Sequence, residues 1–293
     1  MSGLDKRLNA FRPDLADMRL AELLSATRFV AGRLMQICDP VADIRHEPRP
    51  DAPVDSQGLY GEKVLVFEDH EGWCWVQLQT DGYVGYMAHN ALTSRLTNPT
   101  HIVSAPRTFL YPGPDMKYPV AAALSMGTGL CVTGEAETRG TKYFGLASGE
   151  YIIAAHTIGA HTIGAHNRPH DPVAVALRLL ETPYLWGGRS GFGIDCSGLV
   201  QLSHALCGRS LQRDSDMLRN GAGTLIGQGA DHPPLMRGDL VFWKGHVAMM
   251  EDETMMIHAS GHTMSVVREG FADAVQRIEP MYGLPLAYRR IAA

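Results

Sequence analysis

The chain has 293 residues, five cysteines and a net charge of −5 at pH 7. A hydrophobic share of 45% and a charged share of 19% indicate a folded protein of about two domains rather than a disordered chain. No block of lysines and arginines stands out, which argues against nucleic acid as a partner. No segment is apolar and long enough to span a membrane, and the charged N-terminus lacks a signal peptide's apolar core, so we expect a cytoplasmic protein without a membrane partner.

The N-terminal segment, residues 1–33, shows a helical pattern. Within it, residues 14–31 read DLADMRLAELLSATRFVA. The apolar positions at helical spacing are Leu15, Met18, Leu20, Leu23 and Leu24. Such spacing predicts one amphipathic helix.

Strand-length runs replace this pattern between residues 34 and 155. They are rich in Val, Ile and aromatic residues and are bounded by Gly, Pro or Asp, as expected of short strands. Two stretches resemble each other, so we predict two small tandem β-barrels, over 34–95 and 96–155. In the first, GWCWVQL followed by GYVGYM resembles bacterial SH3-like domains. The second is a looser copy that lacks this tryptophan and the second glycine–aromatic turn.

Residues 156–169 are expected to be a linker. They contain HTIGAHTIGAH, with histidines at 156, 161 and 166. A five-residue period places successive side chains on neither one helical face nor one strand face. The repeat therefore favours a linker, and metal binding is the minor interpretation.

The remaining residues, 170–293, combine helices with strands. Asp171 followed by Pro172 is typical of a helix start, and the apolar spacing carries that helix to about Glu181. A glycine-rich turn follows, and a second helix is predicted from Cys196 to Gly208. Four strand-like runs come next: GDLVFWK, GHVAMMED, TMMIHASG and SVVREGF. Helices followed by an antiparallel sheet define an α+β domain.

One cysteine differs in context from the others. Five cysteines without a CxxC pair argue against a disulfide framework and against a thiolate zinc site. Four lie in apolar surroundings where cysteine is usually a small hydrophobic residue. Cys196, in GFGIDCSGLV, stands at a predicted helix start, where the helix dipole favours the thiolate. It is a candidate nucleophile, although a packing role is also common for such a cysteine.

A nucleophilic cysteine needs a base and a group that orients the base. His246 and His258 stand in two consecutive strand-like runs, so their side chains can meet on adjacent antiparallel strands. His246 is the candidate base and His258 the candidate orienting group. Each histidine alone is more often structural than catalytic.

Three motifs in this order, DCSGLVQ, RGDLVFW…GHVAMM and MIHAS, resemble the NlpC/P60 family of cysteine peptidases. The resemblance covers roughly residues 170–290. It implies a circularly permuted or pared-down papain-like α+β core, and it assigns Cys196 as nucleophile, His246 as base and His258 as orienting group. No metal and no organic cofactor are needed for this chemistry.

The same resemblance implies further site residues. Tyr184, in PYLWGG, matches a tyrosine beside the oxyanion, although packing is the alternative. Asp195 and Ser197 flank the nucleophile and match substrate contacts. Asp214 and Ser215 match a substrate-lining RDS motif, but ML follows where the family commonly carries glutamines.

The family resemblance also suggests a substrate. Most members hydrolyse peptidoglycan stem peptides between γ-D-glutamate and a diamino acid, either diaminopimelate or lysine. In a subset with SH3-like domains, the first barrel restricts the site to peptides with a free N-terminal L-alanine. Glu62 and Tyr83 are candidates for pairing with the alanine ammonium and for an aromatic wall; a turn charge and a barrel aromatic are the alternatives.

We therefore expect a cytoplasmic dipeptidyl-peptidase that releases L-Ala-γ-D-Glu from stem peptides during murein recycling. Two other classes of function remain open. One is a cell-wall peptide-binding module without hydrolytic activity. The other is an acyltransferase or amidase that acts on a different amide, since the same cysteine–histidine pair serves several acyl transfers.

Overall fold

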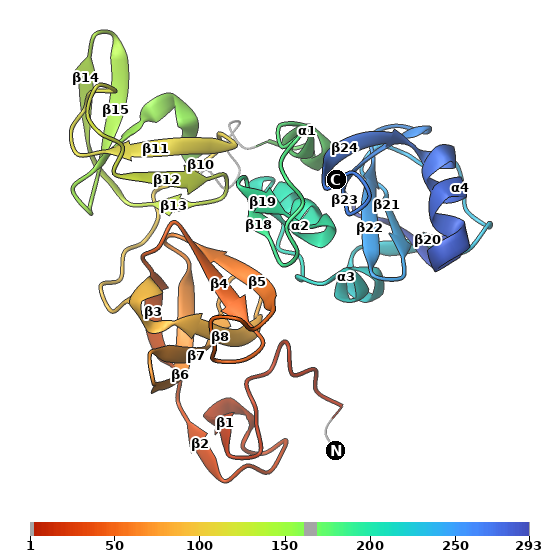
Figure 1. Cartoon of the computed structure of the whole chain (residues 1–293), viewed down its shortest axis with the longest axis horizontal. Coiled ribbons are helices and arrows are strands. Elements are labelled where there is room, and N and C mark those ends of the chain that lie inside the picture. Colours follow the sequence, from red (N-terminus) through yellow and green to blue (C-terminus); the bar gives the residue numbers. More distant parts are fainter. Residues whose placement is uncertain (1–2, 161–168, 293) are drawn as a thin grey trace. The chain divides into compact units, whose positions relative to one another are not determined.

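The computed structural model describes residues 3–160 and 169–292. The chain divides into two units, Met1–His161 and Thr162–Ala293, which are described in turn (Figure 1). No helix in these described ranges has the length and apolarity needed to cross a membrane.

The predicted N-terminal helix over residues 14–31 is wrong. The segment instead forms β1 (Leu15–Asp17), a single 3-10 turn η1 (Met18–Leu20) and β2 (Arg28–Val30), which pairs with β1 in parallel. Leu15 is fully buried against Phe67 and Trp75 of the first barrel, whereas Leu23 is 60% exposed. The apolar positions at helical spacing thus do not share one buried face, and tertiary pairing outweighs helix propensity.

The first barrel contains a seven-stranded antiparallel sheet in the order β5-β4-β8-β7-β6-β3-β9. Its strands are β3 (Arg33–Ile37), β4 (Val41–Arg45), β5 (Val54–Leu59), β6 (Lys63–His70), β7 (Trp73–Leu78), β8 (Val84–Ala88) and β9 (Leu92–Thr93). Alternate residues of β4 and β8 are buried, as expected of strands with one face on a core. The barrel interior holds Ile44, Leu59, Val64, Val76, Leu78 and Met87.

The second barrel is built from two smaller sheets. One has the order β12-β11-β16-β15-β14 and the other β13-β10-β17. The strands are β10 (His101–Val103), β11 (Arg107–Tyr111), β12 (Ala122–Ser125), β13 (Gly129–Leu130), β14 (Val132–Thr138), β15 (Thr141–Leu146), β16 (Tyr151–Ile153) and β17 (Thr157–Gly159). Strand β17 lies within the range expected to be a linker and pairs with β10. Its neighbour His156 contacts Thr108 Oγ1 through Nδ1 at 2.8 Å, whereas His161 and His166 lie outside the described residues.

The two barrels share a local signature at their last strand. In each, a 3-10 turn, η2 (His89–Ala91) or η3 (Ala154–His156), precedes the final short strand. In each, the N–H of the following residue bonds to the first carbonyl of the turn. The same chain path supports the reading of the second barrel as a looser copy of the first.

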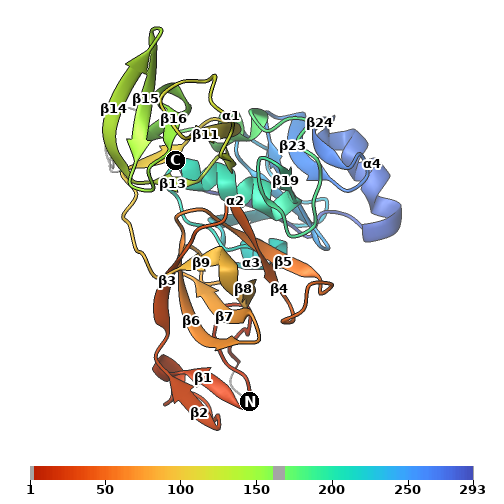
Figure 2. The ribbon, with the colours of Figure 1, turned by 60° about the vertical axis from the view of Figure 1, so that its left-hand side comes forward.

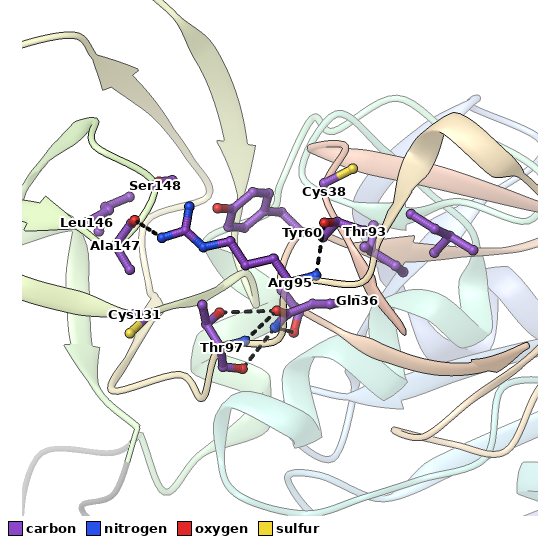
Figure 3. A pocket seen from close by; sticks show the side chains of 13 residues that line it. Gln36, Cys38, Tyr60, Thr93, Arg95, Thr97, Cys131, Leu146, Ala147 and Ser148 are labelled. Atoms are coloured by element: carbon purple, nitrogen blue, oxygen red, sulfur yellow. Dashed lines mark hydrogen bonds between the residues drawn. The ribbon is translucent and has the colours of Figure 1, made fainter. Parts of the chain in front are cut away.

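A pocket of about 390 Å³ lies where the barrels meet within this unit (Figure 3). Gln36 donates to the carbonyl oxygens of Gly61 and Thr97 and accepts the Thr97 N–H, which fixes the connecting segment. Arg95 reaches across and donates to the Ala147 carbonyl at 3.0 Å. Every residue lining this pocket belongs to the barrels, so it is distinct from the cysteine and histidines predicted to be catalytic.

The second unit packs helices on a six-stranded sheet in the order β20-β25-β21-β22-β23-β24. The predicted strands appear as β21 (Leu240–Trp243), β22 (His246–Met250), β23 (Met255–Ser260) and β24 (Ser265–Gly270). The helix predicted from Cys196 is α2 (Cys196–Leu206), and α1 (Pro172–Leu177) is shorter than expected. Helix α2 packs against β22 and β23.

Several elements of this unit had no clear sequence pattern. They are β18 (Arg189–Ser190), β19 (Gly193–Ile194), α3 (Ser215–Gly221), β20 (Thr224–Gly227), α4 (Phe271–Tyr282) and β25 (Ala287–Arg290). Helix α4 buries Ala274 and Ile278 against Val241, Met250 and Met256 of the sheet. It lies at the far side of the sheet from α2 in both views (Figures 1 and 2).

Candidate active site

Cys196 is the first residue of α2, as the sequence predicts. The preceding residue, Asp195, is in an extended conformation, and its carboxylate accepts the Gly198 N–H at 2.7 Å, which caps the helix. The N–H groups of a helix's first turn have no partner within the helix, so this end offers donors to a developing anion. The backbone of Val247, next to His246 in the chain, lowers the pKa of Cys196 and so opposes the effect of burial.

The loop before Cys196 is fixed by a buried ion pair that sequence reasoning missed. Arg213 is 1% exposed and binds both carboxylate oxygens of Asp195, at 2.9 and 2.6 Å. The same guanidinium donates to Ser197 Oγ at 2.9 Å and to the Gly188 carbonyl at 3.2 Å. The planar five-donor group of arginine suits this convergence of acceptors.

This network gives Asp195 and Ser197 an observed structural role. Asp195 also accepts the Gly187 N–H at 3.0 Å, and the Ser197 hydroxyl donates to Asp195 at 3.2 Å. The polar atoms of both side chains are thus engaged with the protein. The predicted residues Asp214 and Ser215 follow Arg213 in the chain. They are the N-cap and the first residue of α3, and both are partly exposed.

His246 and His258 are brought together by the sheet. Strands β22 and β23 pair Met249 with Ile257 and Met250 with Met256. Extending this register places His246 and His258 as diagonal neighbours on one face. Their rings approach with His246 Nε2 2.8 Å from His258 Nδ1. The Nδ1 atom of His246 therefore remains as the ring nitrogen that can serve a thiol.

The contact between His246 and His258 begins a relay of side chains that continues to Glu269 and Arg277, two residues that the sequence did not indicate. His258 pairs with Val267, so Glu269, two residues further along β24, shares the face of His258. Glu269 Oε2 lies 3.1 Å from His258 Nε2. Arg277 of α4 holds the same carboxylate through two bonds, at 2.9 and 2.6 Å.

The order of this relay selects tautomers. The Glu269 carboxylate, 3.1 Å away, favours a proton on His258 Nε2 although this N–H is not aligned for a hydrogen bond, and Nδ1 is then the acceptor. His246 then donates from Nε2 and keeps Nδ1 free of a proton. The bonds to His258 and Arg277 lower the pKa of Glu269 to about 2, so it stays ionised. These contacts leave His246 Nδ1 as the unprotonated ring nitrogen.

Burial makes the resting site neutral. It raises the pKa of Cys196 to about 12, and the Asp195 carboxylate adds to this rise. Burial also lowers the pKa of His246 to about 3, with a further lowering from His258. Burial thus favours the neutral thiol and the neutral imidazole, against the effect of the helix dipole, which the sequence suggested would favour a thiolate.

Tyr184 lies near the cysteine. Burial raises its pKa, and the negative charges that Cys196 and Asp195 can carry raise it further. Its backbone bridges Ile194 and its N–H donates to the Met264 carbonyl at 2.9 Å. Tyr184, His246 and His258 line a pocket of about 540 Å³. Tyr184 thus shares this pocket with the two histidines, and its role beside an oxyanion stays a prediction.

Glu62 and Tyr83 belong to the first barrel and are engaged there. Glu62 accepts the Leu59 N–H at 2.7 Å and the Thr80 hydroxyl at 2.8 Å, and so it holds the turn between β5 and β6. Tyr83 is 4% exposed and forms part of the barrel interior. These contacts match the structural alternatives for both residues and favour neither an amine contact nor an open aromatic wall.

A cysteine at a helix start, packed on a sheet that carries paired histidines, is the arrangement of papain-like cysteine hydrolases. Family models give the same class: the NlpC/P60 family matches residues 181–278, and the bacterial dipeptidyl-peptidase SH3 domain matches residues 44–92. The chain is an NlpC/P60 family protein with an N-terminal SH3-like domain, and it is a peptidase by family.

Relatives of known name extend over both units. Dipeptidyl-peptidase 6 of Lysinibacillus sphaericus is 28% identical over 269 residues, which cover 84% of this chain and 93% of that protein. The γ-D-glutamyl-L-lysine dipeptidyl-peptidase of Bacillus subtilis is 29% identical over 71% of this chain and 73% of its own. An NlpC/P60 family protein of Bacillus cereus has the same fold, with a TM-score of 0.72, 22% identity, and coverage of 89% of this chain and 100% of that one.

Proposed function

We propose that the protein is a cysteine peptidase that cleaves peptidoglycan stem peptides after γ-D-glutamate. The observation that carries the catalytic part is the 2.8 Å contact between His246 and His258, which leaves His246 Nδ1 to serve Cys196. Support for the substrate comes from relatives named for γ-D-glutamyl-L-lysine dipeptidyl-peptidase activity. The bond cleaved is then the amide between γ-D-Glu and diaminopimelate or lysine.

The first half of the reaction forms a thioester. The Cys196 thiol transfers its proton to His246 Nδ1 while the sulfur attacks the γ-carbonyl carbon of D-glutamate. The oxyanion accepts hydrogen bonds from the Cys196 N–H and the Tyr184 hydroxyl. The imidazolium of His246 then protonates the leaving amine of the diamino acid as the carbon–nitrogen bond breaks.

The second half releases the dipeptide. His246 takes a proton from water, the hydroxide adds to the thioester carbon, and the carbon–sulfur bond breaks. The proton returns to the sulfur, and L-Ala-γ-D-Glu leaves with a new carboxylate. His258 and Glu269 hold the tautomer and stabilise the positive charge on His246 in both halves.

The proposal includes a free N-terminal L-alanine on the substrate and a recycling role in the cytoplasm. The amine requirement rests on the dipeptidyl-peptidase names of relatives that span both units. A recycling enzyme meets soluble stem peptides inside the cell, whereas an enzyme that remodels the wall is exported.

The test is digestion of L-Ala-γ-D-Glu-L-Lys and its diaminopimelate counterpart, each with and without an acetyl cap, followed by mass spectrometry. We expect wild type and Cys207→Ala, altered at the other end of α2, to cut only the uncapped peptides, and Cys196→Ala to cut none. Cleavage of capped peptides would replace the dipeptidyl-peptidase with an endopeptidase. No cleavage by wild type would favour a binding module or another acyl transfer.

A further inference from the structure

A second group of reactive side chains lies in the first barrel, in the unit that does not contain Cys196. Asp69 of β6 and Cys74 of β7 are direct cross-strand partners. His89 begins η2 just after β8, and its N–H donates to the Gly72 carbonyl in the β6–β7 turn at 2.8 Å. The strand ladder and this bond bring all three side chains to one end of the hairpin.

The possible ligand atoms of the three side chains lie close together. His89 Nδ1 lies 3.0 Å from Asp69 Oδ1 and 3.8 Å from Cys74 Sγ. One oxygen, one nitrogen and one sulfur atom all lie within 4.8 Å of one another. A proton relay would use both ring nitrogens of the histidine, but here the same nitrogen faces both neighbours.

These separations suit a tetrahedral metal ion. Zinc bonds of about 2.3 Å to sulfur and about 2.0–2.2 Å to nitrogen and oxygen place neighbouring ligand atoms about 3.3–3.6 Å apart. The observed 3.0 and 3.8 Å differ from that range by only a few tenths of an ångström. Thiolate, imidazole and carboxylate together form a donor set suited to zinc.

The surroundings give the group both support and access. Cys74 is fully buried, whereas the side chains of Asp69 and His89 are 35% and 51% exposed. Water can therefore reach the open side and supply a fourth ligand. Arg33 Nη2 lies 3.5 Å from Asp69 Oδ2, which leaves Oδ1 facing the histidine.

We propose that Asp69, Cys74 and His89 bind a zinc ion through Oδ1, Sγ and Nδ1, with water as the fourth ligand. On binding, the Cys74 thiol releases its proton to solvent and the sulfur bonds to the metal. The ion would fasten the end of the β6–β7 hairpin to the turn η2. The peptidase chemistry proposed above requires no metal, so the two proposals stand or fall separately.

The test uses full-length protein carrying Cys196→Ala, which removes the other buried thiol near a histidine. Titration with Co²⁺ should give one equivalent bound and a thiolate-to-cobalt charge-transfer absorption that Zn²⁺ abolishes. His89→Ala should weaken zinc binding at least about tenfold. Cys74→Ser should remove the charge-transfer band. His70→Ala and Cys38→Ser, both exposed sites in the same barrel, should leave both readouts unchanged.

Because Cys74 is buried, its substitution can unfold the barrel. The decisive variant is therefore His89→Ala, since His89 is half-exposed. Retention of the band and of zinc affinity in a folded His89→Ala variant would overturn the proposal. So would the absence of any bound equivalent in the parent protein, in which case Asp69 and His89 form only an ion pair that holds the hairpin.

Discussion

Replacing Glu269 with glutamine tests whether the relay behind His246 matters for catalysis. Glu269 reaches no further than His258, at 3.1 Å, and is fixed by Arg277. It is therefore a positioning residue. Glutamine keeps the size of the side chain but loses the charge and one acceptor oxygen, so the fixed tautomer of His258 is no longer enforced.

The magnitude follows from the loss of the 3.1 Å ion pair between Glu269 and His258, for which a hydrogen bond to a charged group sets the upper scale. A bond to a charged group contributes about 1.5–3 kcal/mol. Each 1.4 kcal/mol or so is a factor of about ten, so kcat should fall about tenfold to a hundredfold with little change in KM. The loss appears in kcat because the carboxylate supports the positive charge that His246 carries only during the reaction.

Glu251→Gln is the matched control. Glu251 makes the same kind of two-bond pair, with Arg268 at 2.6 and 2.9 Å, but the contacts described here do not link it to either histidine. Steady-state kinetics on the uncapped tripeptide should show full activity for this variant. A Glu269→Gln enzyme within twofold of wild type, or an equal loss in both variants, would refute the relay.

Stability against acid provides an independent readout. The pKa of Glu269 lies at about 2 in the folded protein, below the ordinary 4.5. Its contribution to the free energy of unfolding is thus complete above pH 4.5 or so and is lost as the pH falls through about 2. The stability gap between wild type and Glu269→Gln should narrow across that window, measured by urea unfolding at a series of pH values.

Three other predictions concern the nucleophile loop, the thiol and the N-terminal segment. Arg213→Met leaves Asp195 buried without its partner and should cost about 3–5 kcal/mol in urea unfolding of the second unit; a loss below 1 kcal/mol or so would refute the role of the pair. The resting thiol is expected to be protonated, so the rate of Cys196 alkylation by iodoacetamide should be low below pH 6 and should rise with pH above neutral. A constant, high rate below pH 6 would instead indicate a thiolate–imidazolium pair. Leu15→Ala should destabilise the first unit by about 3–5 kcal/mol in thermal unfolding, and Leu23→Ala by less than 0.5 kcal/mol or so. Equal losses for the two variants would instead support the amphipathic helix predicted from the sequence.

Local patterns predicted the parts of the fold that depend on neighbouring residues. The cap at Asp171, the helix from Cys196 and the four predicted strands of the second unit all appear in the structure. The N-terminal helix failed because spacing shows where apolar side chains recur, not whether they share a buried face. Leu15 is buried and Leu23 is exposed, although both fit the same helical stripe.

Residues that act through distant partners escaped prediction. Arg213 lies 18 positions from Asp195, and although it begins the RDS motif, nothing in that motif marks it as buried. The apolar neighbours of Cys74 in WCWV predict a small hydrophobic residue, but the cross-strand pairing with Asp69 gives its thiol a polar neighbour. Glu62 has contacts that match the turn-charge alternative, because its two carboxylate oxygens bond within the barrel, and its contact with a substrate amine stays a prediction.

Strand register places the three side chains of the candidate catalytic relay on one face of the sheet. His246, His258 and Glu269 come from three successive strands, and the pairings of β22 with β23 and β23 with β24 place all three on one face. Side chains alternate between faces, so a slip of one residue in any of these strands would send its member of the relay to the opposite side. Gly245, with φ of 72°, completes the two-residue turn that sets the first residue of β22 opposite Trp243. This backbone turn and the strand pairing together fix the position of His246 in the sheet.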